Sequence, residues 1–285
     1  MRSIKIIALL LFSAFYLKAQ IQLPVEPVFQ NTYLKGTRST DGKPGKKYWQ
    51  NSSNYNLKVD FNPVSRLLKG TVEVVYTNNS PDTLKEIWFK LYPNLYKKGV
   101  PRKARFAEAD LGEGVTVEKL TSNGKSITDF NIDGTNMTVK VPAVLPGKTI
   151  KFDITYNYTL NKGSHMRTGQ VDEGSHFVAY FFPRIAVYDD VDGWNKYPYT
   201  GAEEFYNDFD NFNAEVTVPG GYSVWATGDL KNASDVFQKE IVSKITSAEK
   251  NDAVVDVITE SDLTAKKVTQ PKAFNTFKFE AKNVT

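Results

Sequence analysis

The chain has two histidines, His165 and His176, and no cysteine. Zinc peptidases with a His-Glu-x-x-His helix place two histidines one helical turn apart, with the glutamate between them as general base. Here the two histidines are eleven positions apart, neither is followed by glutamate, and neither segment has helical periodicity. The sequence therefore predicts loop or surface histidines, and it predicts that this chain does not bind zinc with structural or catalytic affinity.

A second candidate for chemistry is a short acidic run. Asp189, Asp190 and Asp192 precede Gly193, which resembles half of a calcium loop. The run lacks the regular spacing and the closing glutamate of an EF-hand, so a turn with solvated carboxylates is favoured. Further acidic and aromatic residues follow closely, and together they could form a surface that meets another domain: Tyr197, Tyr199, Glu203, Glu204, Phe205, Tyr206, Asp208 and Asp210.

Other chemistries have little support. The 32 acidic residues make chance pairs of carboxylates common, so such pairs do not identify a glycosidase. The chain contains no Gly-x-Ser-x-Gly elbow and no Gly-rich loop opening a helix. Its 15 Tyr, 18 Phe and 4 Trp could include platforms that stack on sugar rings, although buried aromatics of alternating strands are the favoured interpretation.

The elements that must position these residues are mainly strands. Residues 55–61 alternate apolar and polar side chains, as does the long run 149–160, and Asp133-Gly134 is a hairpin turn signal. Gly70 is interpreted as a bulge within the second strand. The predicted strands are residues 55–61, 68–77, 87–92, 115–120, 130–132, 137–141, 149–160, 177–182, 212–218, 222–227, 236–245, 253–260 and 276–281.

Helical periodicity is scarce. Only residues 82–90, 93–98 and 261–267 are compatible with a turn or two of helix, the last of them starting at Ser261. About a dozen strands at short spacing with little helix predict an all-β fold, a multi-stranded antiparallel or mixed sandwich or saddle.

The beginning of the chain predicts export. Residues 1–19 combine Arg2 and Lys5 with an apolar run that is too short to span a bilayer comfortably, and a small residue, Ala19, stands at the expected cleavage point. We expect a secretory signal peptide over residues 1–19, an extended leader over 20–48 and one β domain over 49–285. The net charge of +4 is modest and the basic residues are scattered, so we expect neither nucleic acid nor, after cleavage of the signal peptide, a membrane as partner.

Five segments, taken in order, resemble the amino-terminal domain of M1-family zinc metallopeptidases, the aminopeptidase N-like enzymes. They are Tyr55-Asn-Leu-Lys-Val-Asp-Phe61, Leu68-Lys-Gly-Thr-Val-Glu-Val-Val-Tyr76, Ile87-Trp-Phe-Lys-Leu-Tyr92, Phe182-Pro-Arg-Ile-Ala-Val-Tyr-Asp-Asp190 and Phe279-Glu-Ala-Lys-Asn-Val284. The fourth stands where family members cross between two β layers toward the active-site side. The resemblance implies a saddle-shaped β domain.

The same resemblance implies that the catalytic parts lie elsewhere. The family's Gly-x-Met-x-Asn loop, its His-Glu-x-x-His helix, the third glutamate ligand and the transition-state tyrosine would all lie beyond residue 285. Zinc is therefore expected in a separate catalytic domain, with no catalytic residue, metal ligand or cofactor in this chain, which should be inactive alone. Family members hold the substrate's amine with a Gln or Glu near residues 176–180. Neither occurs there, and His176 and Tyr180 are the polar candidates to face a substrate.

The crossing segment, residues 181–194, is nearly all apolar or aromatic rather than alternating. We expect it to expose an apolar patch that a catalytic domain would cover, around Phe181, Phe182, Ile185, Val187, Tyr188 and Trp194. The alternative is that the segment is core. The residues assigned to an interdomain face are Phe182, Arg184, Val187, Tyr188, Asp190 and Trp194.

Two functions from different classes remain open. The chain is either the non-catalytic β domain of a secreted M1-type aminopeptidase, which caps the active-site cleft and shapes access of peptide amino termini, or a stand-alone secreted module that binds glycan or protein. In the first case its partners are its catalytic domain and, through that domain, peptide substrates.

Overall fold

The computed structural model describes residues 24–285, so the expected signal peptide lies outside the described residues. The chain forms two units, Met1–Tyr48 and Trp49–Thr285. Within the described part, no helix is long and apolar enough to cross a membrane.

The leader is not wholly extended, contrary to the sequence prediction, because helix α2 occupies Pro27–Lys35. Pro27 suits the first turn of a helix, where its missing N–H has no partner to lose. Gly36 ends the helix at φ 75°, and its N–H donates to the carbonyl of Tyr33. Pro27 and Gly36 thus mark the two ends of a helix that the weak apolar periodicity of the leader did not predict.

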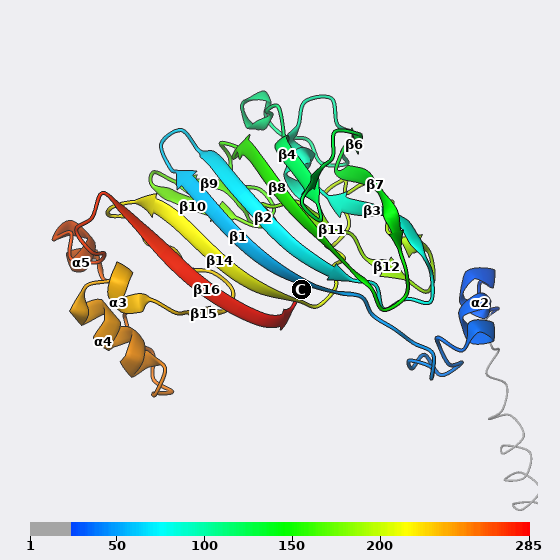
Figure 1. The fold of residues 1–285 in the computed structure, drawn as a ribbon. Helices are drawn as coiled ribbons and strands as arrows, with labels where there is room; N and C mark the ends of the chain where they lie inside the picture. Colours follow the sequence, from blue (N-terminus) through cyan, green and yellow to red (C-terminus); the bar gives the residue numbers. More distant parts are fainter. Residues whose placement is uncertain (1–23) are drawn as a thin grey trace, which may run out of the picture. The chain divides into compact units, whose positions relative to one another are not determined.

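The large unit is built on a mixed eight-stranded sheet with the order β15-β16-β14-β1-β2-β8-β4-β5 (Figure 1). Every pairing in it is antiparallel except that of β1 with β14. Its strands are β1 (Ser52–Asn62), β2 (Leu67–Thr77), β4 (Thr116–Ser122), β5 (Lys125–Ser126), β8 (Thr149–Thr159), β14 (Asp210–Pro219), β15 (Asp229–Leu230) and β16 (Phe274–Val284).

Three smaller sheets complete the strands of this unit. A four-stranded sheet has the order β11-β3-β7-β6, and two-stranded sheets pair β10 with β9 and β12 with β13. The strands are β3 (Leu84–Lys90), β6 (Phe130–Asp133), β7 (Asn136–Val144), β9 (Thr168–Asp172), β10 (Ser175–Val178), β11 (Arg184–Ile185), β12 (Tyr188–Asp189) and β13 (Gly193–Trp194). The all-β fold class predicted from the sequence is confirmed.

The inner face of the large sheet carries two apolar cores. In the first, residues of β1, β2 and β8 such as Tyr55, Val74 and Phe152 pack on Ile87 and Phe89 of the four-stranded sheet. In the second, residues of β14 and β16 pack on two short helices, α3 (Ala233–Val236) and α4 (Lys239–Ala248), at the other end of the sheet (Figure 1). A third short helix, α5 (Glu260–Thr264), and two 3₁₀ turns, η1 (Tyr92–Tyr96) and η2 (Glu108–Asp110), lie outside the sheets.

Three predicted strands and one predicted helical turn are wrong. Residues 236–245 form the end of α3 and most of α4, because Ile241 and Ile245 recur at helical spacing and face the second core. Residues 253–260 form no strand and lead into α5, which Thr259 and Asp262 open with a capping box. Residues 222–227 pair with no strand within residues 24–285. Residues 84–90, within the possible helix 82–90, are strand β3.

Gly70 is not at a bulge, because β2 keeps a regular register with both neighbours, pairing Gly70 with Val59 and with Tyr156. The buried ring of Tyr156 lies across the glycine instead, and a Cβ at position 70 would come within 2.4 Å of a Tyr156 ring carbon. Glycine is required here for close packing of an aromatic ring.

We therefore expect Gly70→Ala to lower the free energy of unfolding by about 1–3 kcal/mol, the usual cost of overpacking a core. Urea denaturation followed by circular dichroism measures it. Gly112→Ala is the matched control, because a Cβ there meets nothing within 4 Å, and stability should be unchanged or slightly higher. Equal losses in the two variants would contradict the packing role of Gly70.

Candidate functional site

The crossing segment, residues 181–194, joins the two layers of the domain. Arg184 and Ile185 form β11 and pair with Lys90 and Phe89 of β3. The backbone N–H of Ile185 also donates to the hydroxyl of Tyr55, a buried residue of β1, over 3.0 Å. The segment is thus fixed to the four-stranded sheet and to the large sheet at the same point.

The centre of this junction is a buried ion pair. Arg184 Nη2 donates to Asp210 Oδ2 at 3.1 Å and to the carbonyl of Asp208 at 2.8 Å, and both charged side chains are almost completely buried. Asp210 Oδ1 accepts the N–H of Ser53 at 2.7 Å. The guanidinium carbon of Arg184 lies 5.2 Å from the ring centroid of Phe212, within cation–π range.

A second carboxyl group, that of Asp208, stands beside this pair. Burial and the neighbouring charge of Asp210 raise the pKa of Asp208 to about 7, and Asp189 acts in the same direction. Burial also raises the pKa of Asp210, although Arg184 opposes the shift. The junction therefore holds the carboxyl groups of Asp208 and Asp210 beside one guanidinium, that of Arg184.

The apolar side chains of the crossing segment are core, so the prediction that they form an exposed patch is wrong. Phe182, Ile185, Val187 and Trp194 are each at least 92% buried, and Arg184 and Asp190 are buried as well. The reason is that the segment runs between two apolar layers, where consecutive side chains, not alternate ones, find apolar neighbours. Tyr188 and Phe181 are half-buried against the same core.

The acidic run within this segment is a turn. Asp189 Oδ1 accepts the N–H groups of Val191 and Asp192, at 2.9 and 2.8 Å, and Asp189 Oδ2 accepts the hydroxyl of Tyr206 at 3.0 Å. The Asp189 side chain thus caps the tight turn that connects β12 and β13, which is a common role of aspartate in turns. Through its bond with Tyr206, Asp189 also holds the loop that follows, residues 195–209.

That loop, residues 195–209, is held by a buried lysine that the sequence analysis missed. Lys90 Nζ donates to the carbonyl of Tyr197 at 2.7 Å and to Asn136 Oδ1 at 2.8 Å. Burial lowers the pKa of Lys90 to about 8. Strand alternation places Lys90 on the side opposite Phe89, so the sequence contained no signal that it would be buried.

The loop also covers a cluster of aromatic rings. Phe205 packs against Tyr92 at 4.8 Å and Tyr199 at 4.7 Å between ring centroids, and Tyr180 stacks on it. Tyr180, expected to face a substrate, therefore has part of its ring covered by this cluster, and it adopts a left-handed φ of 50°. Residues with such backbone strain are concentrated at functional sites.

The two histidines lie in separate, intramolecular environments. His165 Nε2 is 2.8 Å from Asp110 Oδ2, and the ring packs beside Phe106. Burial opposes ionisation of Asp110, but the Gly163 N–H and His165 outweigh it and lower its pKa. His176 packs edge-on against Phe61 at 5.2 Å, and burial, followed by the charge of Arg66, lowers its pKa.

These residues do not fit a zinc ion. Within residues 24–285, no three His, Asp or Glu side chains are grouped so that they could hold a metal. A zinc site needs three or four protein ligands, and here the nearest acidic partner of His165 is a single carboxylate. We therefore assign no metal chemistry to the described residues.

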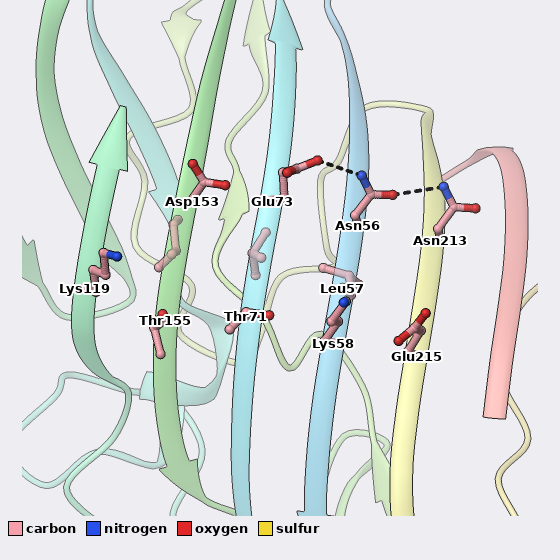
Figure 2. A pocket seen from close by; sticks show the side chains of 12 residues that line it. Asn56, Leu57, Lys58, Thr71, Glu73, Lys119, Asp153, Thr155, Asn213 and Glu215 are labelled. Carbon is pink, nitrogen blue, oxygen red and sulfur yellow. Dashed lines mark hydrogen bonds between the residues drawn. The ribbon is translucent and has the colours of Figure 1, made fainter. Parts of the chain in front are cut away.

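The outer face of the large sheet is polar. Figure 2 shows side chains of five strands around a shallow groove of about 540 Å³. Asn213 donates to Asn56 at 3.0 Å, and Asn56 donates to Glu73 at 2.9 Å, so a row of hydrogen bonds crosses three strands (Figure 2). No aromatic side chain lines this groove, which removes the ring-stacking platform expected of the glycan alternative on this face.

An apolar groove of about 320 Å³ lies on the inner face, at the boundary of the two cores. Its floor comes from β1, β2 and β14, and its walls come from the β9–β10 hairpin region and from residues 222–226. Phe177 and Trp225 at its sides are 56% and 59% exposed. These two aromatics are more exposed than Phe182 and Trp194 of the crossing segment, which are buried.

Comparisons with known proteins give structural matches only. No family model matches the sequence, and no curated protein matches it. A crystal structure of a mutant M1 zinc metallopeptidase from Deinococcus radiodurans matches with a TM-score of 0.44 and 16% identity, over 84% of this chain and 40% of that chain. A form of that mutant bound to a Tyr-Ser-Ala substrate matches with a TM-score of 0.42 and 17% identity, over the same shares.

A third match is aminopeptidase A from Legionella pneumophila in complex with aspartic acid, with a TM-score of 0.38 and 10% identity over 80% of this chain and 19% of that chain. The chain thus spans less than half the length of these structures. M1 zinc metallopeptidases, which the sequence resembles, are therefore among the solved structures that match this chain.

Proposed function

We propose that this chain is the non-catalytic amino-terminal β domain of a secreted M1-type zinc aminopeptidase. In this role it caps the active-site cleft of a catalytic domain and shapes the access of peptide amino termini. Zinc, the water that it activates and the peptide bond that is cleaved all belong to that catalytic domain.

The observation that supports the proposal most is the position of the crossing segment. The five segments of the sequence resemblance fall, in order, on β1, β2, β3 with the start of η1, the β11–β12 crossing and β16. The fourth passes from β11 of the four-stranded sheet to β12 of a separate two-stranded sheet, and its Arg184 forms a buried ion pair with Asp210 of the large sheet. The strained Tyr180 and the loop 195–209 lie next to it in sequence.

The first test is the gene. The reading frame after the codon for Thr285 is expected to encode a Gly-x-Met-x-Asn loop followed by a His-Glu-x-x-His helix. A stop codon there, or an unrelated domain, would contradict the proposal and favour a stand-alone binding module.

The second test is enzymatic. The purified chain is expected to release no chromophore from aminoacyl anilides, because orienting an amine does not activate water or polarise a carbonyl. The polypeptide that includes the downstream region is expected to hydrolyse the same substrates, and a chelator should abolish the activity. Chelator-sensitive turnover by the isolated chain would show that the chemistry lies within it.

A further inference from the structure

Residues 222–227 combine a strand-like sequence with an unpaired backbone. Tyr222, Val224 and Ala226 alternate with Ser223 and Trp225, which is why the sequence predicts a strand. Within the described chain, no hydrogen bond joins the backbone N–H or C=O groups of residues 223–227 to another group. The backbone donors and acceptors of these residues therefore have no partner within residues 24–285, as is the case for one side of an edge strand.

The unpaired segment borders the apolar groove. Tyr222, Val224 and Trp225 line one wall, and Phe177 and Val178 of the β10 region line the other. The groove floor includes Val216, which is half-buried although it lies in a central strand of the large sheet. Trp225 keeps its position by stacking on Phe237, with 5.6 Å between ring centroids. Apolar surface and unpaired backbone therefore coincide.

The charges around the groove restrict its occupant. Its lining contains no acidic or basic side chain, and burial lowers the pKa of its one histidine, His176, which favours the neutral ring. Asp172 and Glu173 are exposed and directly precede Gly174, which lines the groove. The turn of the β9–β10 hairpin beside the groove therefore carries two exposed carboxylates, which complement a basic residue placed at the turn, whereas the positive charge of Arg66 acts on His176.

We propose that residues 223–227 and the groove form a peptide-binding site that takes an extended segment of a partner polypeptide by strand addition. The partner's backbone pairs with residues 223–227, its alternate apolar side chains enter the groove, and a basic residue lies toward Asp172 and Glu173. Recognition of this kind takes its affinity from main-chain hydrogen bonds and its specificity from the pockets for alternate side chains. The site goes beyond the function proposed above and does not require it.

The test uses the purified chain and three capped peptides. Acetyl-Thr-Leu-Thr-Leu-Thr-Lys-amide is expected to bind, shift the tryptophan emission to shorter wavelength and slow hydrogen exchange at amides in residues 223–227. The same peptide with N-methyl groups on alternate backbone nitrogens is expected to bind at least about tenfold more weakly, because it keeps the side chains but loses hydrogen bonds. A peptide ending in glutamate instead of lysine should also bind more weakly.

Two proline variants test the backbone directly. Ala226→Pro and Thr227→Pro each remove one N–H donor at exposed neighbouring positions. Successive N–H groups of a strand point to opposite sides, so one variant should bind the peptide about tenfold more weakly and the other nearly normally. Thermal unfolding monitors folding of both, and Val254→Ser, at an exposed position outside the groove lining, is the control for surface substitution.

Three results would overturn the proposal. The first is no binding of the lysine peptide at 1 mM, a concentration at which even ~4 kcal/mol of affinity is detected. The second is equal binding of the N-methylated peptide, which would show apolar contact without strand pairing. The third is sedimentation of the chain as a dimer in which hydrogen exchange of residues 223–227 is already slow, which would make a second copy the occupant.

Discussion

Replacing Arg184 with methionine is expected to lower the free energy of unfolding by roughly 3–5 kcal/mol at pH 7. Methionine retains apolar bulk but removes the guanidinium, which leaves Asp210 buried without its cation and the carbonyl of Asp208 without its donor. Breaking one side of a buried pair costs this much because the remaining charge is desolvated and unpaired. Urea denaturation of the two proteins measures the difference.

The loss should depend on pH. Burial already places the pKa of Asp210 above its unfolded value, and Arg184 is the charge that opposes this rise. In the variant the carboxyl binds a proton more readily when folded than when unfolded, so the folded state loses stability as pH rises above the unfolded pKa of Asp. The deficit relative to the wild type is therefore expected to be larger at pH 7 than at pH 5.

Arg167→Met is the matched control. Arg167 lies 3.7 Å from Glu204, but the two side chains are 64% and 94% exposed. Exposed pairs contribute little, so this variant should lose less than about 1 kcal/mol. Similar losses for Arg184 and Arg167 would show that the buried pair does not hold the crossing segment.

The sequence predicted the strands best where alternation is undisturbed. Residues 55–61 and 149–160 have one buried and one solvated face, and they became β1 and β8 almost as predicted. The prediction from sequence failed where capping residues and tertiary packing partners decide the structure. Ile241 and Ile245 suit a helix or a strand, and the second core selected the helix, while residues 222–227 have a strand pattern but no partner within the described chain.

The candidate site was less predictable than the fold. The sequence identified the crossing segment, but apolar content alone does not distinguish a buried segment from an exposed docking surface. Arg184 and Asp210 were each singled out, but not as a pair, because they are 26 residues apart and meet only in the folded domain. Lys90 was missed because its burial depends on the loop 195–209, which has no regular structure.

The stability that Lys90 contributes is expected to rise with pH between about 8 and 10.5. Burial lowers the pKa of the folded Lys90 ammonium from 10.5 to about 8. Between these values the unfolded chain binds a proton that the folded chain does not, so unfolding becomes less favourable as pH rises. Each pKa unit corresponds to about 1.4 kcal/mol, so the full change is on the order of 3 kcal/mol.

The measurement is the free energy of unfolding of the wild type minus that of Lys90→Met, determined in urea at intervals from pH 7 to pH 10. Tyrosines and other lysines titrate in both proteins and cancel in the difference, which should increase steadily above pH 8. Lys151→Met is the control, because the bond to Glu73 raises the pKa of Lys151, and its contribution should stay constant to pH 10 and decline only above it. A flat difference for Lys90 would mean that its ammonium is hydrated in the folded protein and that Asn136 and Tyr197 do not hold it in a dry site.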